Sequence, residues 1–163
     1  MRRKDREITD REEILKIIDS CEVVRLGLFD PDDPDYPYIV PVNFGYRVTD
    51  AEEIELFIHG ARAGRKFELM QRSGRCSFEM ECDAYKEILH QDGDVTMRYK
   101  SVMGKAEITL LEGEDVESAL QSLMNRWEDT REFAWNRAAM PRTAAWKLRV
   151  MELSAKASRS VRG

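Results

Sequence analysis

Hydrophobic and polar residues alternate along six segments of the chain, as expected for strands with one buried and one solvated face. In the clearest segment, the residues that would share the buried side are Cys76, Phe78, Met80 and Cys82. Pro41 interrupts another segment, which indicates a sheet edge, a bulge or the end of a strand. The segments that we interpret as β-rich are residues 22–29, 38–48, 51–59, 74–85, 95–111 and 143–157.

Apolar residues at helical spacing predict three helices between these segments. The first would begin at Thr9, because Glu12 follows three residues later as in a capping box. The second would bury Leu69 and its apolar neighbours, and the third would bury a stripe that includes Trp127. The predicted helices cover residues 9–21, 61–73 and 113–129.

These elements predict a mainly β protein with peripheral helices (β or α+β), built on about six mostly antiparallel strands. Alternating strands joined by hairpins suit a small β-barrel, which would leave no open sheet edge. Gly104 marks a candidate bulge within a long strand. A length of 163 residues suits one domain, which we place at residues 1–156, followed by a basic tail at 157–163.

Charge and composition exclude several classes of function. The chain has 26 basic and 31 acidic residues, a net charge of −5, which makes nucleic acid an unexpected partner. No apolar run reaches the ~18–20 residues that span a bilayer, and the start lacks the apolar segment of a signal peptide. The odd count of three cysteines fits reduced thiols. We therefore expect a cytoplasmic protein with no membrane contact, no zinc-ribbon spacing and no metal site.

The junction "HGARAGRK" carries the strongest candidate for chemistry. A strand would deliver His59 to the end of the sheet, and Gly60 would let the backbone approach a ligand. A helix beginning near Gly64 would point free N–H groups at the same place, beside Arg65 and Lys66. A helix start with two cations favours an anion, above all a phosphate. The alternative interpretation is an ordinary solvated start of a basic helix.

Five separated motifs resemble one family. The segments "MRRKDREITD", "VPVNFGY", "HGARAGRK", "RCSFE" and "RYKSVMGKAEI" are similar to the nitroimidazole-resistance proteins of the pyridoxamine 5′-phosphate oxidase-like flavin-binding group. The resemblance runs from Met1 to about Lys156. It implies a split β-barrel, usually a homodimer, with the flavin held at the subunit interface.

The resemblance also implies roles for individual residues. Arg65 and Lys66 would hold the flavin phosphate, and the hydroxyl of Ser101 would add a contact near it. His59 matches a histidine that is characteristic of the nitroimidazole-resistance branch. The residues placed beside the isoalloxazine ring are Pro41, Val42, Asn43 and Phe44.

Two of these roles have structural alternatives. Trp146 would stack on the cofactor if it plays the part of a C-terminal tryptophan in the pyridoxamine phosphate oxidases, but a core or dimer-interface position is the alternative. His59 is either a catalytic or ligand-contacting residue or a histidine that merely ends a strand. The substrate-binding basic pattern of those oxidases has no match here, so oxidation of vitamin B6 is not expected.

The resulting hypothesis is an NAD(P)H-dependent flavin oxidoreductase that reduces a small acceptor such as a nitroaromatic. FMN is the expected cofactor, with FAD left open. His59 would orient the acceptor or supply a proton, because its pKa lies near the working pH. The alternatives are a flavin- or haem-binding module or redox sensor without turnover, and a flavin-free dimeric barrel that kept the fold.

Overall fold

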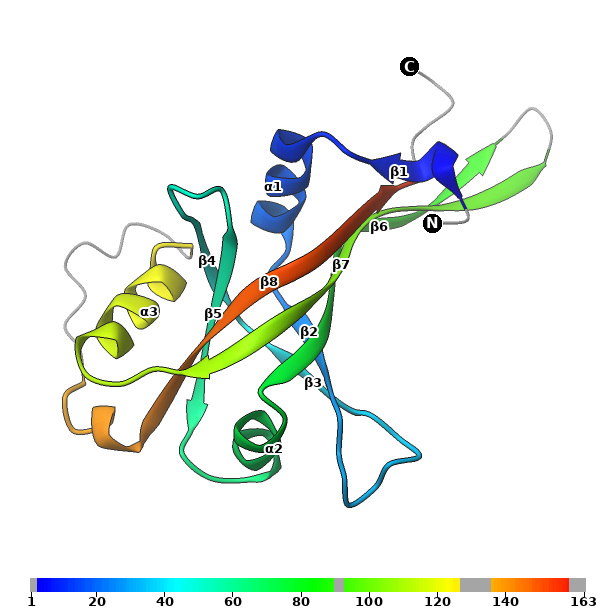
Figure 1. The fold of residues 1–163 in the computed structure, drawn as a ribbon. Helices are drawn as coiled ribbons and strands as arrows, with labels where there is room; N and C mark the ends of the chain where they lie inside the picture. The colour runs from blue at the N-terminus through cyan, green and yellow to red at the C-terminus, as the bar shows by residue number, and fades with distance from the viewer. Residues whose placement is uncertain (1–2, 90–92, 127–135, 159–163) are drawn as a thin grey trace.

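The computed structural model describes residues 3–89, 93–126 and 136–158, which form eight strands, three α-helices and two short 3₁₀ helices (Figure 1). The strands are β1 (Glu7–Ile8), β2 (Val24–Leu28), β3 (Tyr38–Val42), β4 (Gly45–Val48), β5 (Ile54–Ala61), β6 (Arg75–Leu89), β7 (Asp94–Leu110) and β8 (Thr143–Ala157). The helices are α1 (Arg11–Ser20), α2 (Arg65–Ser73) and α3 (Glu114–Met124), with 3₁₀ turns at Lys4–Arg6 and Met140–Arg142.

The strand count exceeds the six predicted for two reasons. Residues 38–48 form two strands, because the chain leaves one edge of the sheet at Asn43 and joins the other edge at Gly45. The short β1 pairs with the end of β8, where Ile8 lies opposite Ala155. Two expectations fall partly outside the described residues: the burial of Trp127 and most of the tail, although Ala157 still belongs to β8.

The strands form one antiparallel sheet in the order β3-β2-β6-β7-β8-β5-β4. Six steps of ~4.8 Å would separate β3 from β4 by roughly 29 Å in a flat sheet. The link from Val42 to Gly45 covers at most about 11 Å, at 3.8 Å per Cα step. The sheet must therefore roll up, which produces the predicted split β-barrel.

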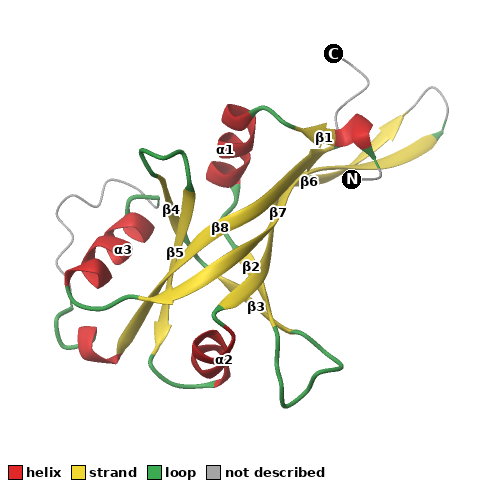
Figure 2. Ribbon diagram, viewed as in Figure 1, coloured by secondary structure: helices red, strands yellow, loops and turns green. Residues whose placement is uncertain are grey.

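The barrel is not closed by hydrogen bonds, so the expectation that no edge stays open was wrong. β3 and β4 are the two edges, and β4 pairs with β5 only from Gly45 opposite Phe57 to Val48 opposite Ile54. The end of β5, residues 58–61, pairs with β8 on its other side. We call the gap between this end of β5 and the edge strand β3 the seam; α2 lies between the ends of the two strands in Figure 2.

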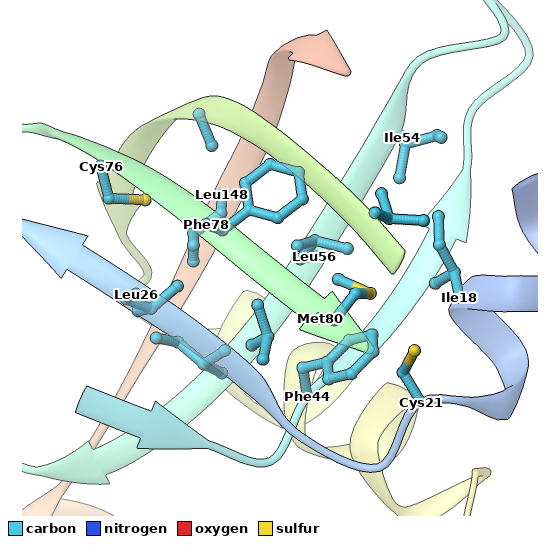
Figure 3. Packing of buried hydrophobic residues seen from close by; sticks show 14 of the residues in the cluster. Ile18, Cys21, Leu26, Phe44, Ile54, Leu56, Cys76, Phe78, Met80 and Leu148 are labelled. Atoms are coloured by element: carbon cyan, nitrogen blue, oxygen red, sulfur yellow. The ribbon is translucent and has the colours of Figure 1, made fainter. Parts of the chain in front are cut away.

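The core fills the inside of the rolled sheet. Strands contribute fully buried side chains such as Leu26, Phe44 and Met80, which converge in Figure 3. The apolar faces of α1 and α2 add Ile18 and Met70 to the same cluster. A second cluster joins α3 to the other face of β5 and β8. None of the described helices is long and apolar enough to cross a membrane.

Two local predictions need correction. The capping residue of α1 lies one position later than expected, because the carboxylate of Asp10, not Thr9, caps the helix by accepting a hydrogen bond from the Glu13 amide at 2.8 Å. The bulge near Gly104 lies on the neighbouring strand β8, where Met151 pairs with no residue of β7. Gly104 serves a different purpose, since a Cβ there would lie 2.4 Å from the Glu152 carbonyl oxygen.

Candidate functional site

The first turn of α2 sits at the seam and has no side-chain cap. Gly64 precedes it with φ of 91°, a conformation that favours glycine. The first intrahelical donor described at this end is the Glu68 amide, which bonds the Gly64 carbonyl at 3.1 Å. The amides before Glu68 therefore carry the positive end of the helix dipole towards the seam.

Lys66 contacts the β5 side of the seam. Its Nζ donates a hydrogen bond to the carbonyl oxygen of His59 at 3.3 Å. Gly60 leaves room for this arrangement, because a Cβ there would lie 2.8 Å from the same Nζ. Partial burial lowers the pKa of Lys66. The ammonium is thus held against backbone next to the helix start.

Arg65 contacts the β3 side of the seam. Its guanidinium forms an ion pair with Asp30, whose side chain is 2% exposed, and lies 5.9 Å from the centre of the Tyr38 ring. Half of the Arg65 side chain remains exposed. Arg65 and Lys66 therefore contact opposite sides of the seam, and the first turn of α2 connects the two sides.

His59 lies in the part of β5 that does not pair with β4, and its side chain is exposed. The surrounding atoms still remove enough of its water to lower its pKa, and the positive charge of Lys66 lowers that pKa further. The imidazole is consequently neutral at pH 7. A neutral ring can accept one hydrogen bond and donate another, but carries no charge.

Trp146 lies beneath this junction in the core. It pairs with Ile58, has no exposed surface and packs edge-on against Phe67 at 5.7 Å between ring centres. Its Nε1 is buried and has no hydrogen-bond partner among the described residues. The side chain has the packing of the core alternative, and its role at a cofactor remains a prediction.

The predicted ring-binding segment runs along the edge strand. Pro41 is exposed on β3, in agreement with the edge position that its missing N–H suggested, and Val42 is half-buried. Asn43 is exposed, and its side-chain amide donates to the Glu22 carbonyl at 3.2 Å. The side chain of Phe44 is fully buried, so only its backbone can approach a ligand at this surface.

Ser101 is the predicted residue that the chain does not bring to the junction. It lies on β7 opposite Lys156 of β8, whereas the junction lies beside Trp146 of that strand. Ten residues of extended chain separate those two positions, roughly 30 Å. Within one chain, Ser101 cannot reach a group bound at the start of α2.

Sequence reasoning missed Asp30 and Tyr38 as parts of this junction. Asp30 directly follows the predicted strand at 22–29, Tyr38 begins the predicted strand at 38–48, and no local spacing links either residue to α2. The aspartates between residues 30 and 35 have a charge opposite to that of the start of α2, which is a signal for this contact. In the described ranges, no group of three or more His, Cys, Asp and Glu side chains is arranged to hold a metal ion.

A separate apolar groove of about 720 Å³ lies on the outer face of the sheet. β2, β3, β6, β7 and β8 all line it, and none of the predicted site residues does. Its lining includes three large side chains that are about half exposed or more, Phe29 (60%), Ile39 (64%) and Met151 (49%). Two charged residues of the lining pair with each other, Lys105 and Glu152, at 2.8 Å.

Known proteins resemble this chain in sequence and in fold. The family profile described as pyridoxamine 5′-phosphate oxidase matches residues 10–157. A solved candidate 5-nitroimidazole antibiotic resistance protein from Bacteroides thetaiotaomicron VPI-5482 is 26% identical, with a TM-score of 0.79 over 93% of this chain and 86% of that one. These findings confirm the resemblance inferred from the motifs.

Two more distant structures share the fold. The FAD and heme binding protein from Mycobacterium smegmatis is 21% identical, with a TM-score of 0.79 over 95% of this chain and 74% of its own. The flavocytochrome Anf3 from Azotobacter vinelandii is 20% identical, with a TM-score of 0.76 over 98% and 72%. Among curated proteins, none matches the chain.

The pKa of His59 tests the geometry of the junction. We expect an NMR titration of the folded protein to give a pKa below the ordinary value of about 6.5. In Lys66→Met that pKa should rise, because a neighbouring positive charge is lost, yet stay below the ordinary value, because the loss of water persists. His90 is the only other histidine and provides the internal control. An unchanged pKa of His59 in Lys66→Met would show that the two side chains are not neighbours.

Proposed function

Because the chain belongs to the pyridoxamine 5′-phosphate oxidase family, we propose that it is a flavin-binding oxidoreductase that uses NAD(P)H to reduce a small acceptor such as a nitroaromatic. One observation carries the proposal: an uncapped helix start, flanked by two cations, lies at the seam of the barrel. The nitroimidazole-resistance description of a 26% identical structure supports the choice of acceptor. The free thiols of the three cysteines support a cytoplasmic location.

The residues at the seam suit a flavin phosphate. Free amides of the first turn of α2, the Lys66 ammonium and the exposed part of the Arg65 guanidinium would bind its oxygens. The exposed edge at Pro41–Asn43 would lie along the ring. When bound, a flavin would supply two-electron transfer from NAD(P)H to the acceptor.

His59 would orient the acceptor rather than act as an acid. Its lowered pKa leaves the imidazole neutral at pH 7, so few molecules carry the proton that an acid would donate. A neutral imidazole N–H can still donate a hydrogen bond to a nitro oxygen. Its exposed position in the part of β5 that does not pair with β4 leaves it open to a small molecule.

FMN is the proposed cofactor, and FAD would need space for an adenosine extension beyond the seam. The names of two structures with this fold, which include FAD, heme and flavocytochrome, support a conjugated ring as the ligand. An absorption spectrum of protein from a flavin-producing host distinguishes a flavin from a haem, and a mass spectrum of the released molecule distinguishes FMN from FAD. A haem Soret band without flavin absorbance would favour the haem-binding alternative.

The outer face supports assembly into a homodimer. Ile39, Met103 and Met151 are 64%, 49% and 49% exposed on the strands of this face, whereas α3 covers the opposite end of the sheet. Exposed apolar groups of this size favour burial against another protein surface. A second copy would also bring a Ser101 hydroxyl to a site that its own chain cannot reach.

The phosphate contact is tested by comparing two flavins. Lys66→Met should weaken FMN binding roughly ten- to a hundredfold, the effect of losing a charge-assisted hydrogen bond. Riboflavin lacks the phosphate, so its affinity should change little. Fluorescence titration of flavin-free protein measures both affinities, and Lys16→Met on the exposed face of α1 is the control. Equal losses for FMN and riboflavin would contradict a phosphate at Lys66.

Turnover is tested by stopped-flow spectroscopy without oxygen. We expect NADH or NADPH to bleach the flavin absorbance within seconds and a 5-nitroimidazole to restore it. His59→Gln should keep the flavin bound and slow only the second step. Bleaching that takes longer than minutes with both donors would contradict the oxidoreductase and favour a flavin carrier or sensor.

The dimer is tested by charging the outer face. The wild-type protein should sediment as a dimer, and Ile39→Glu should sediment as a monomer, because the new carboxylate would be buried without a partner. Val48→Glu, which adds the same charge at an exposed position of β4, should leave the dimer intact. Circular dichroism checks that each variant is folded. A monomeric wild type, or a dimeric Ile39→Glu, would contradict this interface.

A further inference from the structure

Asp30 is the buried charge of the junction. Its Oδ1 accepts a hydrogen bond from the Asp32 amide at 3.0 Å, and its Oδ2 faces Nη2 of Arg65. Only 2% of Asp30 is exposed, and Arg65 is its one ion-pair partner in the part of the chain that is described. The proposed phosphate-binding arginine therefore already contacts a carboxylate.

Arg65 cannot leave this carboxylate for a ligand without isolating a buried negative charge, which is strongly unfavourable. The guanidinium has five N–H donors, so it can keep Asp30 on Nη2 and offer the remaining donors to a phosphate. When the Arg65 guanidinium contacts both Asp30 and a phosphate, the pair that it forms with Asp30 has no net charge. Of the two cations at the helix start, Lys66 alone then adds a full positive charge.

A second acid on the same loop, Asp32, is neither buried nor in direct contact with Arg65. Asp32 pairs with Arg72 in the last turn of α2 at 2.7 Å, and both side chains are at least half exposed. This pair lies at the far end of the helix from the uncapped amides. This pair also links the loop to α2. A variant of Asp32 therefore tests whether an effect of Asp30 comes from a lost structural link or from its charge at the site.

We infer that Asp30 determines the charge preference of the flavin site, by opposing the binding of a doubly charged terminal phosphate through Arg65. The inference rests on the proposed function, in which that phosphate binds at the start of α2. A ligand with no phosphate should not sense Asp30. The carboxylate thereby keeps FMN from binding as tightly as the helix start and two cations would otherwise allow.

The experiment measures the ratio of FMN to riboflavin affinity in flavin-free protein. Asp30→Asn keeps the shape and the acceptor oxygen but removes the charge. It should raise FMN affinity roughly a hundredfold relative to riboflavin, the effect of one unit charge on a doubly charged phosphate at about 6 Å and an effective dielectric constant of about 40. The FMN affinity of this variant should also fall more steeply with added salt. Asp32→Asn should change the ratio less than twofold.

Two further variants complete the test. In an Arg65→Gln background, the Asp30→Asn change should give a smaller gain than it gives in the wild type, because Asp30 acts through Arg65. If circular dichroism shows that Asp30→Asn is unfolded, Asp30→Ser is measured in its place, since its hydroxyl can accept the Asp32 amide.

An affinity ratio that is unchanged or lower without the Asp30 charge overturns this inference and leaves the flavin site standing. A failure of the wild type and all variants to bind either flavin overturns the proposed function and this inference together. A gain of the same size in Asp32→Asn also overturns it, because the effect would then belong to the loop and not to the buried charge.

Discussion

The short link at Asn43–Phe44 is the constraint on which the rest of the structure depends. It joins the two edges of the sheet directly, so the sheet has to roll and bring β3 close to β4 and β5. Phe44 anchors the link with a fully buried ring, over which the Arg126 guanidinium lies at 4.2 Å. The same guanidinium donates to carbonyls at the end of α1, including Cys21 at 2.7 Å. Interior packing and a cation–π contact thus hold the point from which the seam opens.

The seam in turn gives α2 its unusual position. The first turn of α2 lies between the ends of β3 and β5 and contacts residues on both sides. Lys66 satisfies a β5 carbonyl, and Arg65 pairs with Asp30 beside β3. The helix start keeps free amides while its cations are partly occupied by the protein. We interpret this balance as a site that attracts a phosphate without leaving strong charges unpaired.

Much of this fold could be predicted because its signals are local. Alternation over residues 74–85 correctly assigned Cys76, Phe78 and Met80 to the interior of β6, and helical spacing identified α1, α2 and α3. What the sequence could not provide depends on register and on contacts between distant segments. The distance between Ser101 and α2 follows from pairings among β5, β7 and β8, and the Asp30–Arg65 pair joins a loop to a helix with three strands between them in the chain. An open edge looked unfavourable from general principles, yet β3 and β4 remain the two ends of the sheet in the described chain.

The most direct test of this account is a crystal structure of the protein grown with FMN. We predict the phosphate within hydrogen-bond distance of the first-turn amides of α2, with Lys66 and Arg65 around it and Arg65 still on Asp30. The ring should extend along Pro41–Asn43. A flavin bound wholly in the outer groove, with the start of α2 facing solvent, would contradict the central claim.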